Sequence, residues 1–192
     1  MIKKSSPYYQ NIPNILSISR IILTFIIIYL VFTNAPILTI VILFALAAIT
    51  DFFDGHLARR FKWESEFGRK IDIIADRFLW FGTALSLVVS YGLRSELKWE
   101  QGIPLLFMMS REIISMPFAL VAFYSRKGIP HARLIAKYTT LIQGFALPAI
   151  ILSIKFPSWA YVSFPLSIAA GITGFISAMH YMNDINKQEK KK

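Results

Sequence analysis

The sequence contains no cysteine, which excludes disulfide bonds and thiolate metal ligands. Acidic residues are also scarce, with 11 Asp and Glu against 21 Lys and Arg. Internal repeats, low-complexity segments and linkers long enough to separate domains are absent as well. These absences predict one domain that covers residues 1–192.

Long apolar blocks dominate what is present. Hydrophobic residues make up 55% of the chain and the mean hydropathy is +0.53, too high for an ordinary soluble domain. We expect an all-α integral membrane protein, a bundle of six transmembrane helices after a short interfacial N-terminal segment. Pro13 should break any earlier helix, and Asn14 should cap the first span. The expected spans are residues 15–32, 36–59, 70–93, 101–124, 134–154 and 159–182, with a loop at 60–69.

The formal net charge of +10 has two interpretations. Nucleic-acid binding is one, but the basic residues flank the apolar blocks and no nucleic-acid motif accompanies them. Membrane topology is the other, because cytoplasmic loops of membrane proteins are enriched in Lys and Arg. The basic residues concentrate at both termini and in residues 60–69 and 126–133. We therefore expect a multi-pass cell-membrane protein with cytoplasmic termini and active site, and no nucleic-acid partner.

Four of the five aspartates lie within residues 51–76. Asp51 and Asp54 are three residues apart and Asp72 and Asp76 are four apart, so each pair shares one helix face. Charges next to hydrocarbon must be paired, solvated or bound to cations. Four carboxylates on two facing helices suit hard cations such as Mg²⁺, Mn²⁺ or Ca²⁺. A purely structural set of salt bridges is less favoured because burying charges rarely repays its cost, and an EF-hand loop needs a different spacing.

Small and basic residues accompany the first aspartate pair. Gly55 removes a side chain where a bulky group must approach the backbone, and Ala58 keeps the same face small one turn later. Arg59 adds a guanidinium group that suits phosphate. The pattern thus predicts metal ligands, a groove and a phosphate-binding group in one place.

The full pattern reads Asp51-x2-Asp54-Gly55-x2-Ala58-Arg59-x8-Gly68-x3-Asp72-x3-Asp76. At every fixed position it resembles the signature of the CDP-alcohol phosphatidyltransferase family, and the length and six-span layout fit that family too. The resemblance implies a single displacement, in which an acceptor hydroxyl attacks the β-phosphorus of a CDP-linked lipid and CMP leaves. It also implies a homodimer.

Site roles follow from the resemblance position by position. Asp51, Asp54 and Asp72 are implied ligands of two Mg²⁺ or Mn²⁺ ions, and Asp76 is an implied ligand or the general base. Cations would neutralise the diphosphate and the leaving CMP, and a carboxylate within reach would accept the hydroxyl proton. The implied CDP-lipid site comprises Asp54, Gly55, Ala58, Arg59, Gly68 and Asp72.

Segments outside the signature bear on the acceptor. Three of them resemble stretches of phosphatidylglycerophosphate synthases: Asn11-Ile12-Pro13-Asn14, Ser110-Arg111-Glu112-Ile113 and Ala136-Lys137-Tyr138-Thr139-Thr140. Ile73 and Arg77 depart from those enzymes, and the pair Asp76-Arg77 is more similar to inositol-type and serine-type members. We predict transfer from CDP-diacylglycerol to glycerol 3-phosphate, giving phosphatidylglycerophosphate and CMP. Inositol phosphate, or phosphatidylglycerol as in a cardiolipin synthase, is the alternative acceptor.

Basic residues on the expected cytoplasmic side suit an anionic acceptor. Arg111, Arg133 and Lys137 are candidates to bind its phosphate. Arg133 and Lys137 could equally be ordinary positive charges that flank a membrane span. Arg111 could instead form an ion pair with Glu112. Arg20 lies inside the first span, where acceptor binding and a structural ion pair are both open.

A divalent-cation transporter is the distant alternative to an enzyme. It would use the four aspartates as a transport site but leaves Gly55, Ala58 and Arg59 unexplained. Aromatic and methionine side chains in the spans, Phe78, Trp80, Phe107 and Met108, are interpreted as packing or lipid-facing residues.

Overall fold

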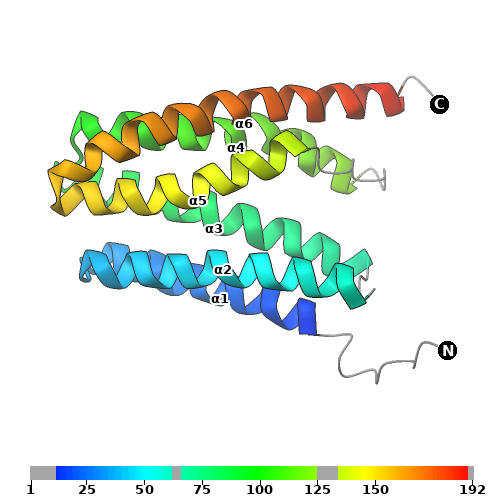
Figure 1. The fold of residues 1–192 in the computed structure, drawn as a ribbon, viewed down its shortest axis with the longest axis horizontal. Helices are drawn as coiled ribbons and strands as arrows, with labels where there is room; N and C mark the ends of the chain where they lie inside the picture. The colour runs from blue at the N-terminus through cyan, green and yellow to red at the C-terminus, as the bar shows by residue number, and fades with distance from the viewer. Residues whose placement is uncertain (1–11, 62–65, 125–133, 190–192) are drawn as a thin grey trace. The chain divides into compact units, whose positions relative to one another are not determined.

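The computed structural model describes residues 12–61, 66–124 and 134–189, and all its regular structure within them is helical (Figure 1). The helices are α1 (Ile12–Phe32), α2 (Ile37–Phe61), α3 (Glu66–Leu93), α4 (Trp99–Tyr124), α5 (Leu134–Lys155), the 3₁₀ helix η2 (Pro157–Trp159) and α6 (Ala160–Glu189). Side chains are described except at residues 12–13, 51–61, 66–67, 69–70, 73, 111, 115–124, 136, 181 and 184–189. The chain divides into two compact units, Met1–Ser90 and Tyr91–Lys192. A single domain stays a prediction.

Six long helices lie at the positions of the six expected spans, with clear differences at three places. The last helix continues to Glu189, beyond the expected end at residue 182. The first helix begins at Ile12, so Pro13 lies inside its first turn and Asn14 is not its cap. Proline is tolerated there because first-turn N–H groups have no partner within the helix. The expected loop at 60–69 is shorter than predicted, since α2 continues to Phe61 and α3 begins at Glu66. Charged residues with good helix propensity extend these helices beyond the apolar blocks.

A tight turn joins α1 to α2 in the first unit. Asn34 has a φ of 58°, a left-handed conformation that Asn adopts more readily than most residues. Its N–H donates to the carbonyl oxygen of Val31 at 3.3 Å, and the N–H of Ala35 donates to that of Leu30 at 3.0 Å. These two bonds form a Schellman motif that ends α1. The chain therefore reverses at once, and α1 and α2 pack side by side (Figure 1).

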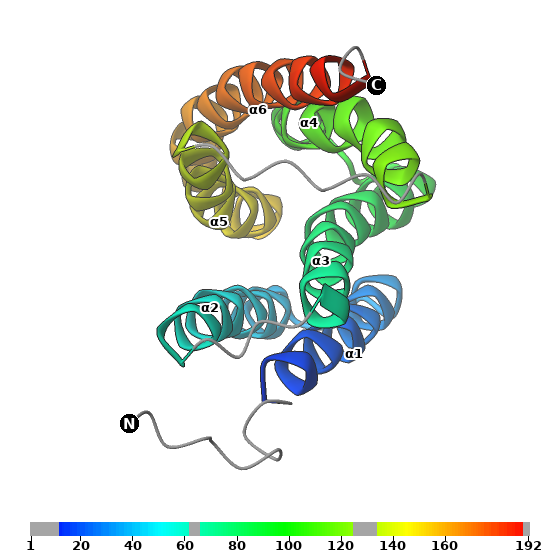
Figure 2. The same cartoon turned by 90° about the vertical axis from the view of Figure 1, so that its right-hand side faces the viewer.

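The third helix packs against both of its predecessors in this unit (Figure 2). The rings of Phe25 and Phe78 lie 5.0 Å apart near one level. Towards the other end, the Ser90 hydroxyl donates to the carbonyl oxygen of Val31 at 3.1 Å. Residue numbers rise together in these two contacts, so α3 runs parallel to α1. The intervening α2 is therefore antiparallel to both.

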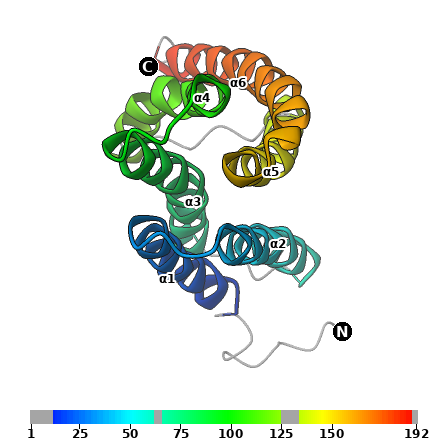
Figure 3. The ribbon, with the colours of Figure 1, turned by 90° about the vertical axis from the view of Figure 1, so that its left-hand side faces the viewer.

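The second unit is built around α6, which packs along both α4 and α5 (Figure 3). Its inward side consists of small residues, which allow helix backbones to approach closely. Gly171 shows how closely: a Cβ there would lie 2.8 Å from Cδ1 of Phe107 and 3.3 Å from the carbonyl oxygen of that residue. The buried small residues of α6 are Ser163, Ser167, Ala170, Gly171, Gly174, Ser177 and Ala178.

Two buried glutamines join α4 to α5. Gln143 donates to the carbonyl oxygen of Met108 at 3.3 Å, and Gln101 donates to that of Ser153 at 3.2 Å. Interhelical bonds of this kind satisfy polar groups where water is absent. They also fix α4 and α5 as an antiparallel pair.

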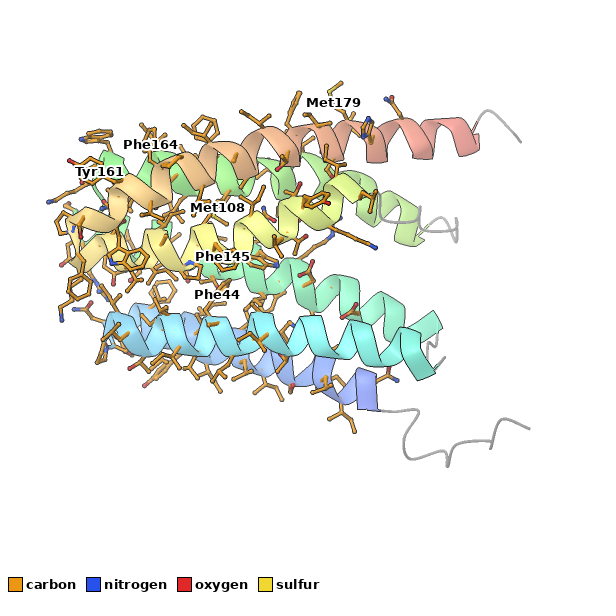
Figure 4. The ribbon with its side chains drawn as sticks, viewed as in Figure 1. Phe44, Met108, Phe145, Tyr161, Phe164 and Met179 are labelled. Carbon is orange, nitrogen blue, oxygen red and sulfur yellow. The ribbon has the colours of Figure 1, made fainter. Side chains whose placement is uncertain are left out.

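Large apolar side chains cover the outward faces of the helices. On α6, Tyr161 and Met179 are 87% and 48% exposed and project away from the helix (Figure 4). Within the described residues, three helices are long and apolar enough to cross a bilayer: Asn14–Phe32, Lys137–Lys155 and Pro157–His180. This agrees with the expected membrane protein, while the count of six spans stays a prediction.

Candidate active site

The signature divides between two helices of the first unit. The residues from Asp51 to Arg59 occupy the last turns of α2, as their helical spacing predicted, but their side chains lie outside the described residues. That set comprises Asp51, Asp54, Gly55, Ala58 and Arg59. Gly68, Asp72 and Asp76 occupy the first turns of α3, and all three are partly exposed.

Helix register brings the two halves of the signature to one level. The rings of Phe44 on α2 and Trp80 on α3 lie 5.0 Å apart, which fixes a common level for these antiparallel helices. Asp51 follows Phe44 by about 10 Å along α2, and Asp72 precedes Trp80 by about 12 Å along α3. Asp76 precedes it by about 6 Å. The Asp51 backbone thus lies level with the α3 segment between the two aspartates, while convergence of all four carboxylates stays a prediction.

Asp72 is held by the first helix. Nη1 of Arg20 lies 3.2 Å from Oδ1 of Asp72, and the Ser17 hydroxyl donates to the same oxygen at 3.3 Å. The Arg20 side chain is fully buried, whereas 42% of the Asp72 side chain is exposed. Of the two roles left open for Arg20, the structure shows the ion pair. Ser17 was not predicted, although its position three residues before Arg20 places both on one helix face.

Asp76 is held from within its own helix. Nε1 of Trp80 donates to Oδ1 of Asp76 at 2.7 Å, one helical turn away. The indole is buried and meets the Phe44 ring edge-on at an interplanar angle of 75°. Trp80 packs as expected, but its hydrogen bond to Asp76 was not predicted. The i to i+4 spacing of an indole donor and a carboxylate was the available signal.

The described half of the predicted ligand set suits a hard cation. Asp72 and Asp76 offer carboxylate oxygens, the donors that Mg²⁺ and Mn²⁺ prefer. Each carboxylate is oriented by a donor from the protein at one oxygen, as outer-shell partners orient metal ligands elsewhere. The residues therefore fit the predicted group.

The predicted acceptor residues belong to the second unit. Arg133 lies outside the described residues, and so does the side chain of Arg111 on α4. Lys137 is exposed on the first turn of α5. Glu112, next to Arg111, is only 5% exposed. An acceptor pocket formed by the three basic residues stays a prediction.

Comparison with known proteins covers both units. The family model described as CDP-alcohol phosphatidyltransferase matches residues 10–176. A Rickettsia bellii protein named CDP-diacylglycerol–glycerol-3-phosphate 3-phosphatidyltransferase is 31% identical over 170 residues, 88% of this chain and 90% of its own. Proteins of the same name from Rickettsia typhi and Pectobacterium atrosepticum are 33% and 36% identical, covering 88% and 73% of this chain and 91% and 76% of theirs. The chain is a membrane protein that belongs to the CDP-alcohol phosphatidyltransferase family.

Proposed function

We propose that this protein transfers the phosphatidyl group of CDP-diacylglycerol to glycerol 3-phosphate, giving phosphatidylglycerophosphate and CMP. The observation that carries the proposal is that relatives with this printed activity match 88% of the chain, through both units. The complete signature supports the shared donor chemistry. The resemblances at Ser110–Ile113 and around Lys137 support the acceptor.

The reaction requires one P–O bond to form and one to break. The acceptor hydroxyl oxygen attacks the β-phosphorus, the diphosphate bond breaks, and CMP leaves with its electron pair. Asp76 accepts the hydroxyl proton as general base. Two Mg²⁺ or Mn²⁺ ions, held by Asp51, Asp54, Asp72 and Asp76, would neutralise the diphosphate and the leaving CMP.

The remaining signature residues bind the CDP-lipid. Arg59 pairs with a phosphate oxygen, and Gly55 and Ala58 leave room on α2 for the nucleotide. Gly68 likewise leaves room for the nucleotide at the start of α3. Asp54 and Asp72 contribute to this site as well as to the metal site.

All six long helices cross the membrane in this proposal. The three that are not among the spans named above, α2, α3 and α4, have 25, 28 and 26 residues, about 38–42 Å at 1.5 Å per residue. The hydrocarbon core is about 30 Å thick. The excess of basic residues at the termini and at 60–69 and 126–133 supports a cytoplasmic position for these segments and for the active site. The protein acts as one catalytic domain and as a homodimer.

An acceptor panel tests the proposal. Purified protein in detergent with CDP-diacylglycerol and Mg²⁺ should release CMP with glycerol 3-phosphate, and far less with inositol phosphate or phosphatidylglycerol. EDTA should abolish release, and excess Mg²⁺ or Mn²⁺ should restore it. Release of CMP with inositol phosphate as the only active acceptor would assign the protein to another branch of the family. No CMP with any acceptor, together with cation flux into vesicles, would favour the transporter.

Lys137→Ala should raise KM for glycerol 3-phosphate by about tenfold and leave KM for the CDP-lipid unchanged, because one charge-assisted phosphate contact is worth about 1.5–3 kcal/mol. Arg111→Ala and Arg133→Ala should act in the same direction. Lys155→Ala, at the far end of α5, is the matched control. An equal change in both KM values would assign Lys137 to general electrostatics.

Trp80→Phe should lower kcat by about 10- to 100-fold with little change in KM. The variant keeps the edge-on contact with Phe44 but removes the N–H that orients Asp76, and a hydrogen bond to a charged group is worth about 1.5–3 kcal/mol. The assay is CMP release at saturating substrates. A wild-type kcat in this variant would show that Trp80 contributes only packing and does not orient Asp76.

A further inference from the structure

The fully buried Arg20 calls for an explanation beyond pairing. It lies within a helix apolar enough to span a bilayer, where an arginine is costly unless it is compensated. Replacing buried ion pairs by apolar residues often leaves a protein equally stable, so stability alone is a weak reason to keep one. Arg20 pairs with the third signature aspartate, Asp72.

The geometry of the pair is asymmetric. If the pair served only to neutralise two buried charges, both side chains should be buried. The Arg20 side chain is fully buried, but the Asp72 side chain is 42% exposed. Ser17 and Arg20 both donate to Oδ1 of Asp72. In the described part of the chain, no donor contacts Oδ2. The first helix thus fixes one oxygen of the carboxylate and leaves the other accessible.

We infer that Ser17 and Arg20 are positioning residues for the metal site: they hold the Asp72 carboxylate by Oδ1, in an orientation that would keep Oδ2 available to a cation. This inference rests on the proposed function, because that function makes Asp72 a ligand. It extends the active site from the two signature helices to α1. Arg20 reaches the reaction only through Asp72, so it is not a catalytic residue.

Direct cation binding tests the inference without turnover. Mn²⁺ is titrated into purified full-length protein in detergent, and free Mn²⁺ is measured by electron paramagnetic resonance. Arg20→Gln should weaken Mn²⁺ affinity by about 10- to 100-fold, the range seen when outer-shell partners of metal ligands are removed. Arg20→Lys keeps a charged donor and should recover part of this loss. Ser17→Ala should show a smaller loss in the same direction.

Ser19→Ala is the matched control, because Ser19 lies on the same helix but its hydroxyl donates to the carbonyl oxygen of Leu16. It should bind Mn²⁺ like the wild type. If Arg20→Gln fails to fold, the Mn²⁺ affinities of Arg20→Lys and Ser17→Ala test the inference instead. Wild-type Mn²⁺ affinity in folded variants, with only a lower unfolding midpoint, would make the pair structural and overturn the inference. CMP release is scored separately, so failure of the proposed function is distinguishable from failure of this inference.

Discussion

Asp76→Asn should lower CMP release by at least about a thousandfold while the protein stays folded. The substitution keeps the shape of the side chain and its acceptor oxygen for Trp80, but it removes the charge that binds a cation and the base that accepts the hydroxyl proton. General-base catalysis alone contributes about 10²–10⁴-fold. Asp72→Asn should have a similar effect, because it weakens a metal ligand and leaves Arg20 facing a neutral amide.

Asp184→Asn is the matched control for these variants, since Asp184 is the one aspartate of the sequence outside the signature. It should keep wild-type turnover. Far-ultraviolet circular dichroism and size-exclusion elution in detergent establish that each variant is folded. Near-normal turnover in a folded Asp76→Asn protein would remove Asp76 from its role as base. The same result for Asp72→Asn would remove that residue from the metal site.

Gly171→Leu should destabilise the protein by about 3 kcal/mol or more, with Gly171→Ala costing about 1–3 kcal/mol. A Cβ at this position would lie 2.8 Å from Cδ1 of Phe107 and 3.3 Å from both its Cβ and its carbonyl oxygen. The ring alone cannot relieve the overlap, because the backbone of α4 is also too close. The larger leucine side chain should therefore push α4 and α6 apart at this contact and loosen the packing around it.

The readout is the thermal unfolding midpoint in detergent. Gly102→Ala provides the control, because its added Cβ would be 3.8 Å from the nearest side-chain atom, Cδ2 of Leu97, an ordinary contact. Alanine also has the higher helix propensity, so this variant should be as stable as the wild type or slightly more so. Equal midpoints for Gly171→Leu and Gly102→Ala would mean that α4 and α6 do not pack as closely as described.

Much of the fold could be predicted from the sequence because hydrocarbon imposes simple rules on a chain. Each apolar block must form a helix that satisfies its own backbone, so the positions of the helices could be predicted from composition. Helix ends were harder to predict. They depend on local capping and propensity, as shown by Pro13 within the first turn of α1 and by the charged turns that extend α2 and α3.

The candidate site was predictable to the extent that its chemistry is local. The aspartates could be found because helical spacing places each pair on one face. Arg20 was noticed as a charge within a span, but its partner lies 52 residues away, and no local pattern identifies a contact between two helices. Trp80 was overlooked because an indole ring in an apolar block usually only packs.

The turn between α1 and α2 has a consequence for biogenesis. Residues 33–36 carry no charge, and the N–H groups of the first three are already bonded to carbonyls at the end of α1. In the proposed orientation this is the segment that the insertion machinery must translocate to the outer surface. Because the turn is too short to let α1 settle independently, both helices should enter the lipid together, as one preformed helical hairpin.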